Sequence, residues 1–166
     1  MYIRKTTFDD LDKVIEIYAF AQKFMRESGN DDQWGDVHPP RKLIEEDIRD
    51  GVSYVCVNGD EILAVFMIST LPDPTYTIIE GAWLNDAPYC VVHRIARAEN
   101  GKGAGAFCLN WCFEKYKNVR IDTHRDNAPM LKLLKNLGYQ YCGIIWVEIM
   151  GEKDERLAFQ RIADIK

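Results

Sequence analysis

The sequence predicts an α/β fold in which a mixed central β-sheet is flanked by helices on both faces. Segments whose apolar residues alternate, as in strands, are interspersed with segments whose apolar residues recur at a helical period. A Gly-rich stretch joins a strand pattern to a helix pattern in the second half of the chain. The 166 residues are 47% hydrophobic and 28% charged, which is typical of one compact domain over residues 1–166.

The N-terminal third is predicted to form a strand, a helix, a loop and a second helix. Residues 2–6 alternate as a strand, and Asp9 or Asp10 can cap a helix whose apolar residues keep a helical period as far as the loop. Residues 29–40 are rich in Gly, Pro and Asp, which indicates that loop. Residues 41–49 then form the second, shorter helix.

The rest of the chain supplies most of the sheet. Gly59-Asp60 is a hairpin signal between strands at 52–58 and 61–69. Strands at 75–80 and 89–96 are expected to complete the central sheet and to lead into the Gly-rich stretch. The elements expected after it are a helix at 107–117, a strand at 120–123, a helix at 128–137 and strands at 141–149 and 156–162.

The Gly-rich stretch Asn100-Gly101-Lys102-Gly103-Ala104-Gly105 has the pattern of an anion site. Glycines let the backbone approach a ligand closely, and the helix that follows presents free N–H groups and a partial positive charge, so a diphosphate would fit. The stretch lacks the Gly-Lys-Ser/Thr ending of a Walker loop and the glycine spacing of a dinucleotide fold. Taken alone, it is explained equally well as an ordinary connection between a strand and a helix.

A second block follows in the order Asp122-Thr123-His124, Asn127 and Gly138-Tyr139. Together with the loop, which follows the family pattern Gln/Arg-x-x-Gly-x-Gly/Ala except at Asn100, this block resembles the GNAT superfamily of N-acetyltransferases, in particular a bacterial acetyltransferase subgroup. The resemblance extends over residues 1–161. It implies a GNAT-like acyl-CoA acyltransferase fold and an enzyme that uses acetyl-CoA.

The resemblance also implies how the chain would bind coenzyme A. Residues 101–106 would cradle the pyrophosphate, the strand around His93 would bind the pantetheine arm, and an N–H near Ile95 would stabilise the oxyanion. The expected cofactor-binding residues are His93, Arg94, Ile95, Asn100, Gly101, Lys102, Gly103, Ala104, Gly105, Ala106 and Asn127. For Asn127, a plain helix cap explains the residue as well as a ligand contact does, and it can serve both roles.

Two departures from the family pattern affect the expected chemistry. Asn100 replaces the usual Gln or Arg, so Lys102 is expected to take over a pyrophosphate contact. Leu134 stands where many members carry a Tyr that protonates the leaving thiolate. Tyr139 is the candidate acid in its place, unless it only packs. Unassisted or water-mediated protonation is the third alternative, since a thiolate leaves readily.

Two side chains are candidates for the general base that removes a proton from the amine. Glu80 could do so directly or through water, and histidine is a residue type suited to this work, so His93 is the second candidate. A hydrogen-bonded structural role is the alternative for His93. Asp122 and His124 could orient each other or the substrate, although Asp122 could equally be tied to the backbone.

The expected acceptor is a primary amine of a small molecule or a peptide, acetylated by direct attack on the thioester. Trp34 and Trp83 would form aromatic walls for it, or else anchor their loops to the core. Two alternatives stay open. The protein could be a non-catalytic module that binds or senses acyl-CoA, or an interaction protein that keeps the fold for structural reasons.

Composition limits the other partners. The net charge of −5 and the lack of a Lys/Arg stripe argue against binding nucleic acid. No apolar segment suits a membrane span and no leader pattern precedes the first strand, so a cytoplasmic location is expected. The five cysteines fit buried thiols, and Cys108 and Cys112 alone do not make a zinc site, so no metal is expected. A homodimer is expected only because dimers are common in the family.

Overall fold

The computed structural model describes residues 1–164 of the chain. The helices are α1 (Leu11–Glu27), α2 (Arg41–Arg49), α3 (Ala104–Tyr116) and α4 (Ala128–Asn136), with short 3₁₀ turns at Phe8–Asp10 and Pro74–Tyr76. The strands are β1 (Tyr2–Lys5), β2 (Ser53–Asn58), β3 (Glu61–Ser69), β4 (Glu80–Gly81), β5 (Cys90–Arg97), β6 (Asn118–Thr123), β7 (Gln140–Ile149) and β8 (Glu152–Ile162).

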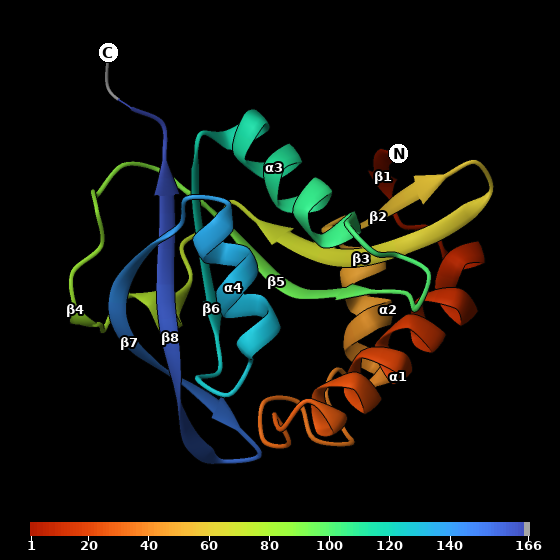
Figure 1. The fold of residues 1–166 in the computed structure, drawn as a ribbon, viewed down its shortest axis with the longest axis horizontal. Helices are drawn as coiled ribbons and strands as arrows, with labels where there is room; N and C mark the ends of the chain where they lie inside the picture. Colours follow the sequence, from red (N-terminus) through yellow and green to blue (C-terminus); the bar gives the residue numbers. More distant parts are fainter. Residues whose placement is uncertain (165–166) are drawn as a thin grey trace.

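These strands form one mixed sheet in the order β1-β2-β3-β5-β6-β8-β7-β4. Its neighbouring strands run antiparallel except for β5 and β6, which are parallel. A parallel pair needs a crossover connection, and α3 supplies it between β5 and β6 (Figure 1). The predicted α/β class with a mixed sheet is therefore confirmed.

Helices cover both faces of the sheet, as expected (Figure 1). On one face, Leu109 of α3 and Leu134 of α4 belong to the same buried cluster as Phe66 of β3. On the other face, Ile17 of α1 belongs to a cluster with Val65, which is the residue before Phe66 in the same strand. Successive side chains of a strand point to opposite faces, so β3 carries both cores.

The predicted strand at residues 75–80 is wrong. The side chain of Asp73 accepts a hydrogen bond from the N–H of Thr75 (2.9 Å), and Pro74 begins a 3₁₀ turn instead of a strand. Only Glu80–Gly81 is extended, and it pairs with β7 at the far edge of the sheet. β3 consequently pairs directly with β5.

The other differences concern where elements begin. α3 starts at Ala104, three residues before the expected position, because Gly103 in the left-handed region (φ 86°) serves as its N-cap. β8 starts at Glu152 and not at 156, because Met150 and Gly151 form a two-residue hairpin turn in which both φ angles are positive (53° and 81°). None of the described helices has the length and apolar character required to span a bilayer.

The Gly-rich loop is held against β3 by its backbone. The N–H of Ala98 donates to the carbonyl of Leu63 (2.8 Å), and the N–H of Gly101 donates to the carbonyl of Ala98 (3.0 Å). A Cβ atom on Gly101 would lie 2.2 Å from the Leu63 carbonyl oxygen, so this position requires glycine for packing alone. A Cβ on Gly105 would meet only Leu133, at an ordinary 3.5 Å.

We predict that Gly101→Ala lowers the free energy of unfolding by about 2 kcal/mol or more, because the backbone of β3 or of the loop must move. The matched control Gly105→Ala adds the same methyl group without a clash, and it should change that free energy by less than about 1 kcal/mol. Urea unfolding monitored by circular dichroism measures both. Equal stability of the two variants would contradict the close approach of Gly101 to β3.

Candidate active site

The parallel strands β5 and β6 pair over two residues and then separate. The only matched positions are Cys90 with Val119 and Val91 with Arg120, although β5 continues to Arg97. Beyond Val91 the backbone N–H and C=O groups of the two strands therefore do not hydrogen-bond to each other. Such groups need a ligand or water as a partner. A cavity of about 230 Å³ lies at this divergence, lined from both strands by Val92, His93, Arg94, Ile95, Ile121, Asp122 and Thr123.

A β-bulge sits on β5 at the edge of this cavity. Met67 of β3 pairs with His93 and Val65 pairs with Ala96, so Arg94 and Ile95 both lie opposite the one residue between Val65 and Met67. Arg94 has a φ of 50°, which is uncommon for a residue other than glycine. The bulge changes the direction of the strand at the place where the sequence predicts the pantetheine contact and the oxyanion donor.

Two contacts from α1 and α2, which cover one face of the sheet, hold Arg94 in this conformation. The hydroxyl of Tyr18 donates to the Arg94 carbonyl (2.8 Å), and the guanidinium of Arg94 makes two hydrogen bonds to Asp47 (2.9 and 2.8 Å). Burial raises the pKa of Asp47, and the charge of Arg94 partly offsets that effect. Because the guanidinium of Arg94 is engaged by Asp47, a cofactor contact from this residue would have to come from its backbone.

His93 lies in the cavity between two carboxylates. Its Nε2 is 2.7 Å from Oδ2 of Asp73, and its Nδ1 is 3.8 Å from Oδ1 of Asp122. Tyr76 donates its hydroxyl to the same Oδ1 of Asp122 (2.6 Å). Burial opposes ionisation of Asp73, but hydrogen bonds from His93 and Thr75 outweigh it and lower the pKa of Asp73 to about 2. A histidine oriented by an ionised carboxylate is the usual arrangement of a general base.

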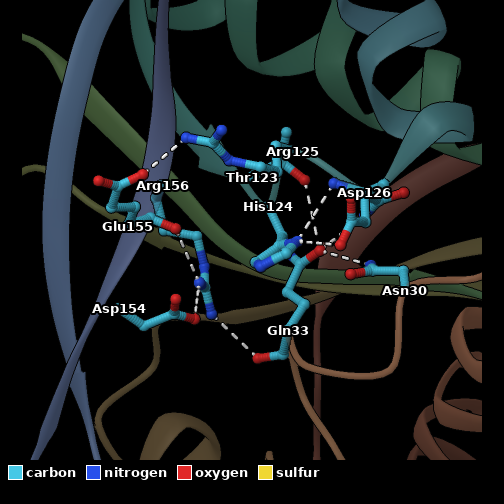
Figure 2. Close-up of polar contacts among 10 residues, drawn as sticks. Asn30, Gln33, Thr123, His124, Arg125, Asp126, Asp154, Glu155 and Arg156 are labelled. Atoms are coloured by element: carbon cyan, nitrogen blue, oxygen red, sulfur yellow. Dashed lines mark hydrogen bonds and ion pairs between the residues drawn. The ribbon is translucent and has the colours of Figure 1, made fainter.

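The loop between α1 and α2 is attached to the cavity through Gln33. Its side-chain oxygen accepts hydrogen bonds from Asn30 (2.8 Å) and Asn127 (2.9 Å), and its carbonyl accepts one from Arg156 of β8 (3.1 Å). Figure 2 shows Gln33 between Asn30, Arg156 and the end of β6 at Thr123. Asn127 and Arg156, from two other parts of the chain, therefore fix this loop beside the divergence of β5 and β6.

Asn127 serves as a cap and also lines the cavity. Its side-chain oxygen accepts a hydrogen bond from the N–H of Met130 (3.2 Å), which caps α4, while its amide nitrogen is the donor to Gln33. The structural alternative considered for this residue is thus confirmed. A ligand contact from Asn127 stays a prediction.

The same loop brings two more side chains to the cavity. Trp34 is buried and its ring packs edge-on against Tyr18 and His38. Sequence reasoning missed His38, which lines the cavity too. Burial, followed by the charges of Arg94 and other nearby groups, lowers the pKa of His38 to about 4, so this imidazole is neutral at neutral pH. The only local signal was a histidine within a loop rich in Gly, Pro and Asp.

Asp122 and His124 do not orient each other. Asp122 contacts Tyr76 and His93, whereas Nδ1 of His124 accepts a hydrogen bond from the N–H of Asp126 (3.1 Å) and lies 3.6 Å from its carboxylate (Figure 2). The alternative in which the side chain of Asp122 is tied to the backbone is also incorrect. Its partners are side chains of the cavity.

Three of the residues predicted for catalysis or substrate binding do not line the cavity, and neither does the Gly-rich loop. Glu80 is exposed on β4, where it pairs with Ile144 at the far edge of the sheet. Tyr139 is buried in the core beside α4 with no partner for its hydroxyl, and burial raises the pKa of Tyr139. Trp83 donates its ring N–H to the carbonyl of Tyr76 (2.9 Å) and lies against the guanidinium of Arg120. Leu134 is fully buried.

The Gly-rich loop presents free backbone donors before α3. The N–H groups of Lys102, Gly103, Gly105 and Ala106 have no backbone acceptor within residues 1–164. Such groups at a helix N-terminus favour an anion. The side chain of Lys102 is exposed, while that of Asn100 donates to Glu61 of β3 (3.4 Å).

A diverging parallel strand pair, a bulge beside it and a Gly-rich turn before the next helix define an acyl-CoA acyltransferase fold of the GNAT type. A GNAT-family acetyltransferase from Streptococcus agalactiae has 30% sequence identity and a TM-score of 0.86, with 99% of this chain and 96% of that chain covered. The chain belongs to the GNAT family of acetyltransferases. No family model and no curated protein matches the sequence.

Two more distant structures share the fold. A GNAT-family acetyltransferase from Listeria monocytogenes has 18% identity and a TM-score of 0.67, with 96% of this chain and 93% of that chain covered. A ribosomal-protein-alanine N-acetyltransferase from Brucella melitensis has 17% identity and a TM-score of 0.65, with 98% and 100% covered. At this level of identity the likeness concerns the fold alone.

The pKa of Asp73 gives a prediction about stability. The pKa is lowered from its ordinary value of 3.8 to about 2, so the ionised carboxylate stabilises the native state above about pH 4, and this contribution is lost as the pH falls toward 2. Asp73→Asn should lower the free energy of unfolding by roughly 2 kcal/mol at pH 7 and by little at pH 2.

Urea unfolding at several pH values measures this difference, with Asp31→Asn as the control because Asp31 is an exposed aspartate of the loop between α1 and α2. A loss of stability in Asp73→Asn that does not vary between pH 2 and pH 7 would contradict the ionic role of Asp73.

Proposed function

We propose that the protein is an acetyl-CoA-dependent N-acetyltransferase that moves an acetyl group to a primary amine of a small molecule or a peptide. The observation that carries this proposal is the position of His93, which lies with its carboxylate partner Asp73 in the gap between β5 and β6. Membership of the GNAT family supports acetyl transfer in general.

The residues around the gap fit coenzyme A. The unpartnered N–H groups of Lys102, Gly103, Gly105 and Ala106 suit its pyrophosphate. The part of β5 that no longer pairs with β6 has free backbone groups for the amides of the pantetheine arm, as a strand has for an added strand. Acetyl-CoA would supply the activated acyl group as a thioester.

In this mechanism the chain positions the groups and moves one proton. The amine nitrogen bonds to the thioester carbonyl carbon, the carbon–sulfur bond breaks, and His93 accepts the proton that the amine loses. Asp73 orients the imidazole, and a backbone N–H at the bulge near Ile95 stabilises the oxyanion. The thiolate leaves unassisted or takes a proton from water, since Leu134 occupies the place of the usual acid.

His38 is the second candidate base. It is neutral at neutral pH, as a base must be, and it lines the same cavity. His93 is preferred because the carboxylate of Asp73 hydrogen-bonds its Nε2 and orients the ring, whereas within residues 1–164 the ring of His38 has no hydrogen-bonded carboxylate and packs edge-on against Trp34. A protein that only senses acyl-CoA would bind the thioester without consuming it, and the kinetic experiment below separates the two functions.

Gly103→Val should weaken acetyl-CoA binding at least tenfold, since the left-handed conformation at the head of α3 is strained with a branched side chain and the loop must rearrange. Gly59→Val is a matched control, because Gly59 also has a positive φ (61°) and open space around it but lies in the β2–β3 hairpin. Thermal shift with acetyl-CoA, coenzyme A, ATP and NAD measures binding.

Stabilisation of the wild type by acetyl-CoA and coenzyme A alone is the expected result. If the folded wild type responds to neither, or if both glycine variants lose binding equally, the loop is an ordinary connection and the proposal fails.

His93→Gln should lower kcat by about 100-fold or more with little change in KM for acetyl-CoA, because a lost general base slows the chemical step and not binding. His38→Gln is the comparison in the same cavity and should retain most of the wild-type kcat. Thiol release with a screen of primary amines measures both. A larger loss in His38→Gln would assign the base to His38, and acetyl-CoA binding without thiol release for any amine would indicate a sensor.

Three further statements stay predictions from the sequence. They are the organisation of residues 1–166 as one domain, a cytoplasmic location and the formation of a homodimer.

A further inference from the structure

β7 has an open edge beyond its contact with β4. On one side it pairs with β8 along its whole length, from Gln140 to Ile149. On the other side β4 covers only Gly143 and Ile144. Within the described part of the chain, no strand pairs with the remaining edge, from Ile145 to Ile149. A free edge offers backbone donors and acceptors to an added strand.

The register identifies which residues face outward. Met150 and Gly151 form a two-residue turn, and in such hairpins the flanking pair, here Ile149 and Glu152, exchanges its hydrogen bonds. Because backbone groups alternate sides along a strand, those of Trp146 and Glu148 point away from β8. These two residues supply the free edge.

A second cavity lies along this edge beside the first. It is bounded by the open edge of β7, by the segment that follows β3 and by Lys153 of β8, with lining residues Pro74, Thr75, Ile78, Trp146, Val147, Glu148 and Lys153. We call it the β7 trough. Thr75, Val147 and Glu148 also line the cavity that holds His93, so one end of the trough lies next to the candidate active site. Ile78, which is 74% exposed, gives the trough an apolar wall.

Charge sets the direction in which a chain would lie in the trough. The end of the trough at the active site carries the carboxylates of Asp73, Asp122 and Glu148. The nearby guanidiniums of Arg94 and Arg156 are paired with Asp47 and Asp154, and the ammonium of Lys153 lines the trough but not the cavity that holds His93. A free N-terminal ammonium is therefore favoured at the active-site end.

We propose that the acceptor is a peptide with a free N-terminus, which adds as an antiparallel strand to the edge of β7 and places its α-amino group beside His93. This deepens the proposed function and rests on it. The backbone groups of Trp146 and Glu148 bind the peptide without regard to its sequence. The antiparallel direction follows because the active site lies at the C-terminal end of β7.

Trp146→Pro tests the edge directly. Proline at this position removes the N–H that faces the trough. The N–H groups of β7 that bond to β8 remain, and sheet edges tolerate proline for this reason. Trp146→Ala is the matched control, since it removes the side chain and keeps the N–H. The probes are a mixture of tetrapeptide amides with free N-termini, and alanine amide as an amine without a following chain.

The peptides should be acetylated with at least tenfold higher kcat/KM than alanine amide. Trp146→Pro should lower kcat/KM for the peptides about tenfold relative to Trp146→Ala, with the rate for alanine amide and the thermal shift by coenzyme A unchanged. If the wild type prefers alanine amide, or if the two variants lose the same activity toward peptides, the proposal is overturned. Acetylation of no amine at all would refute the proposed function as well.

A second measurement does not depend on how Trp146→Pro folds. N-methylation of the peptide, one amide at a time, should reduce acetylation at alternate positions only, because every second backbone amide of an added strand faces β7. Loss at every position or at none overturns the proposal. The edge of β7 could instead bind a second copy of this chain. Sedimentation of the wild type and of Trp146→Pro tests this. If the wild type is a dimer, Trp146→Pro is a monomer and the peptide kinetics are unchanged, a second copy occupies the edge and the proposal is overturned.

Discussion

The separation of β5 from β6 is the constraint on which the rest of the structure depends. A parallel pair normally continues its ladder, but here it ends after two registers and leaves backbone groups unsatisfied inside an otherwise continuous sheet. The sheet tolerates this because each strand has another partner, β3 for β5 and β8 for β6. The gap thus costs few hydrogen bonds and leaves backbone groups of both strands in the cavity wall, suited to a ligand with amides of its own.

To keep that gap open, the β-bulge at Arg94 and Ile95 must hold its backbone conformation. Arg94 has a positive φ, a conformation that costs on the order of 1–3 kcal/mol for residues other than glycine. Tyr18 of α1 holds its carbonyl and Asp47 of α2 holds its guanidinium, so the two helices of one face fix the backbone of the strand they cover. If either Arg94 or Asp47 lost its charge, the charge of its partner would be left uncompensated. The pair therefore serves to position the backbone more than to stabilise the fold.

Local signals predicted the parts of the site that depend on backbone. Gly101, Gly103 and the cap at Asn127 are recognisable from neighbouring residues, and so are most helices and strands. The pairing of His93 with Asp73 was not predictable, since the two lie 20 residues apart and meet only because residues 74–76 turn instead of extending. The Thr, Tyr and Ile content of residues 75–80 favoured a strand, whereas the Asp73 cap and the burial of Tyr76 against the sheet decided otherwise.

The paired charges of the cavity explain why an amine suits it. Both arginines on its wall are neutralised by carboxylates outside it, so Asp73 and Asp122 beside His93 are the charges that an incoming ligand meets. The second histidine adds no positive charge, because burial and the neighbouring cations lower the pKa of His38 to about 4 and leave it uncharged. A cation entering this cavity is attracted by the carboxylates and meets a neutral imidazole in His38, whereas an anion would be repelled.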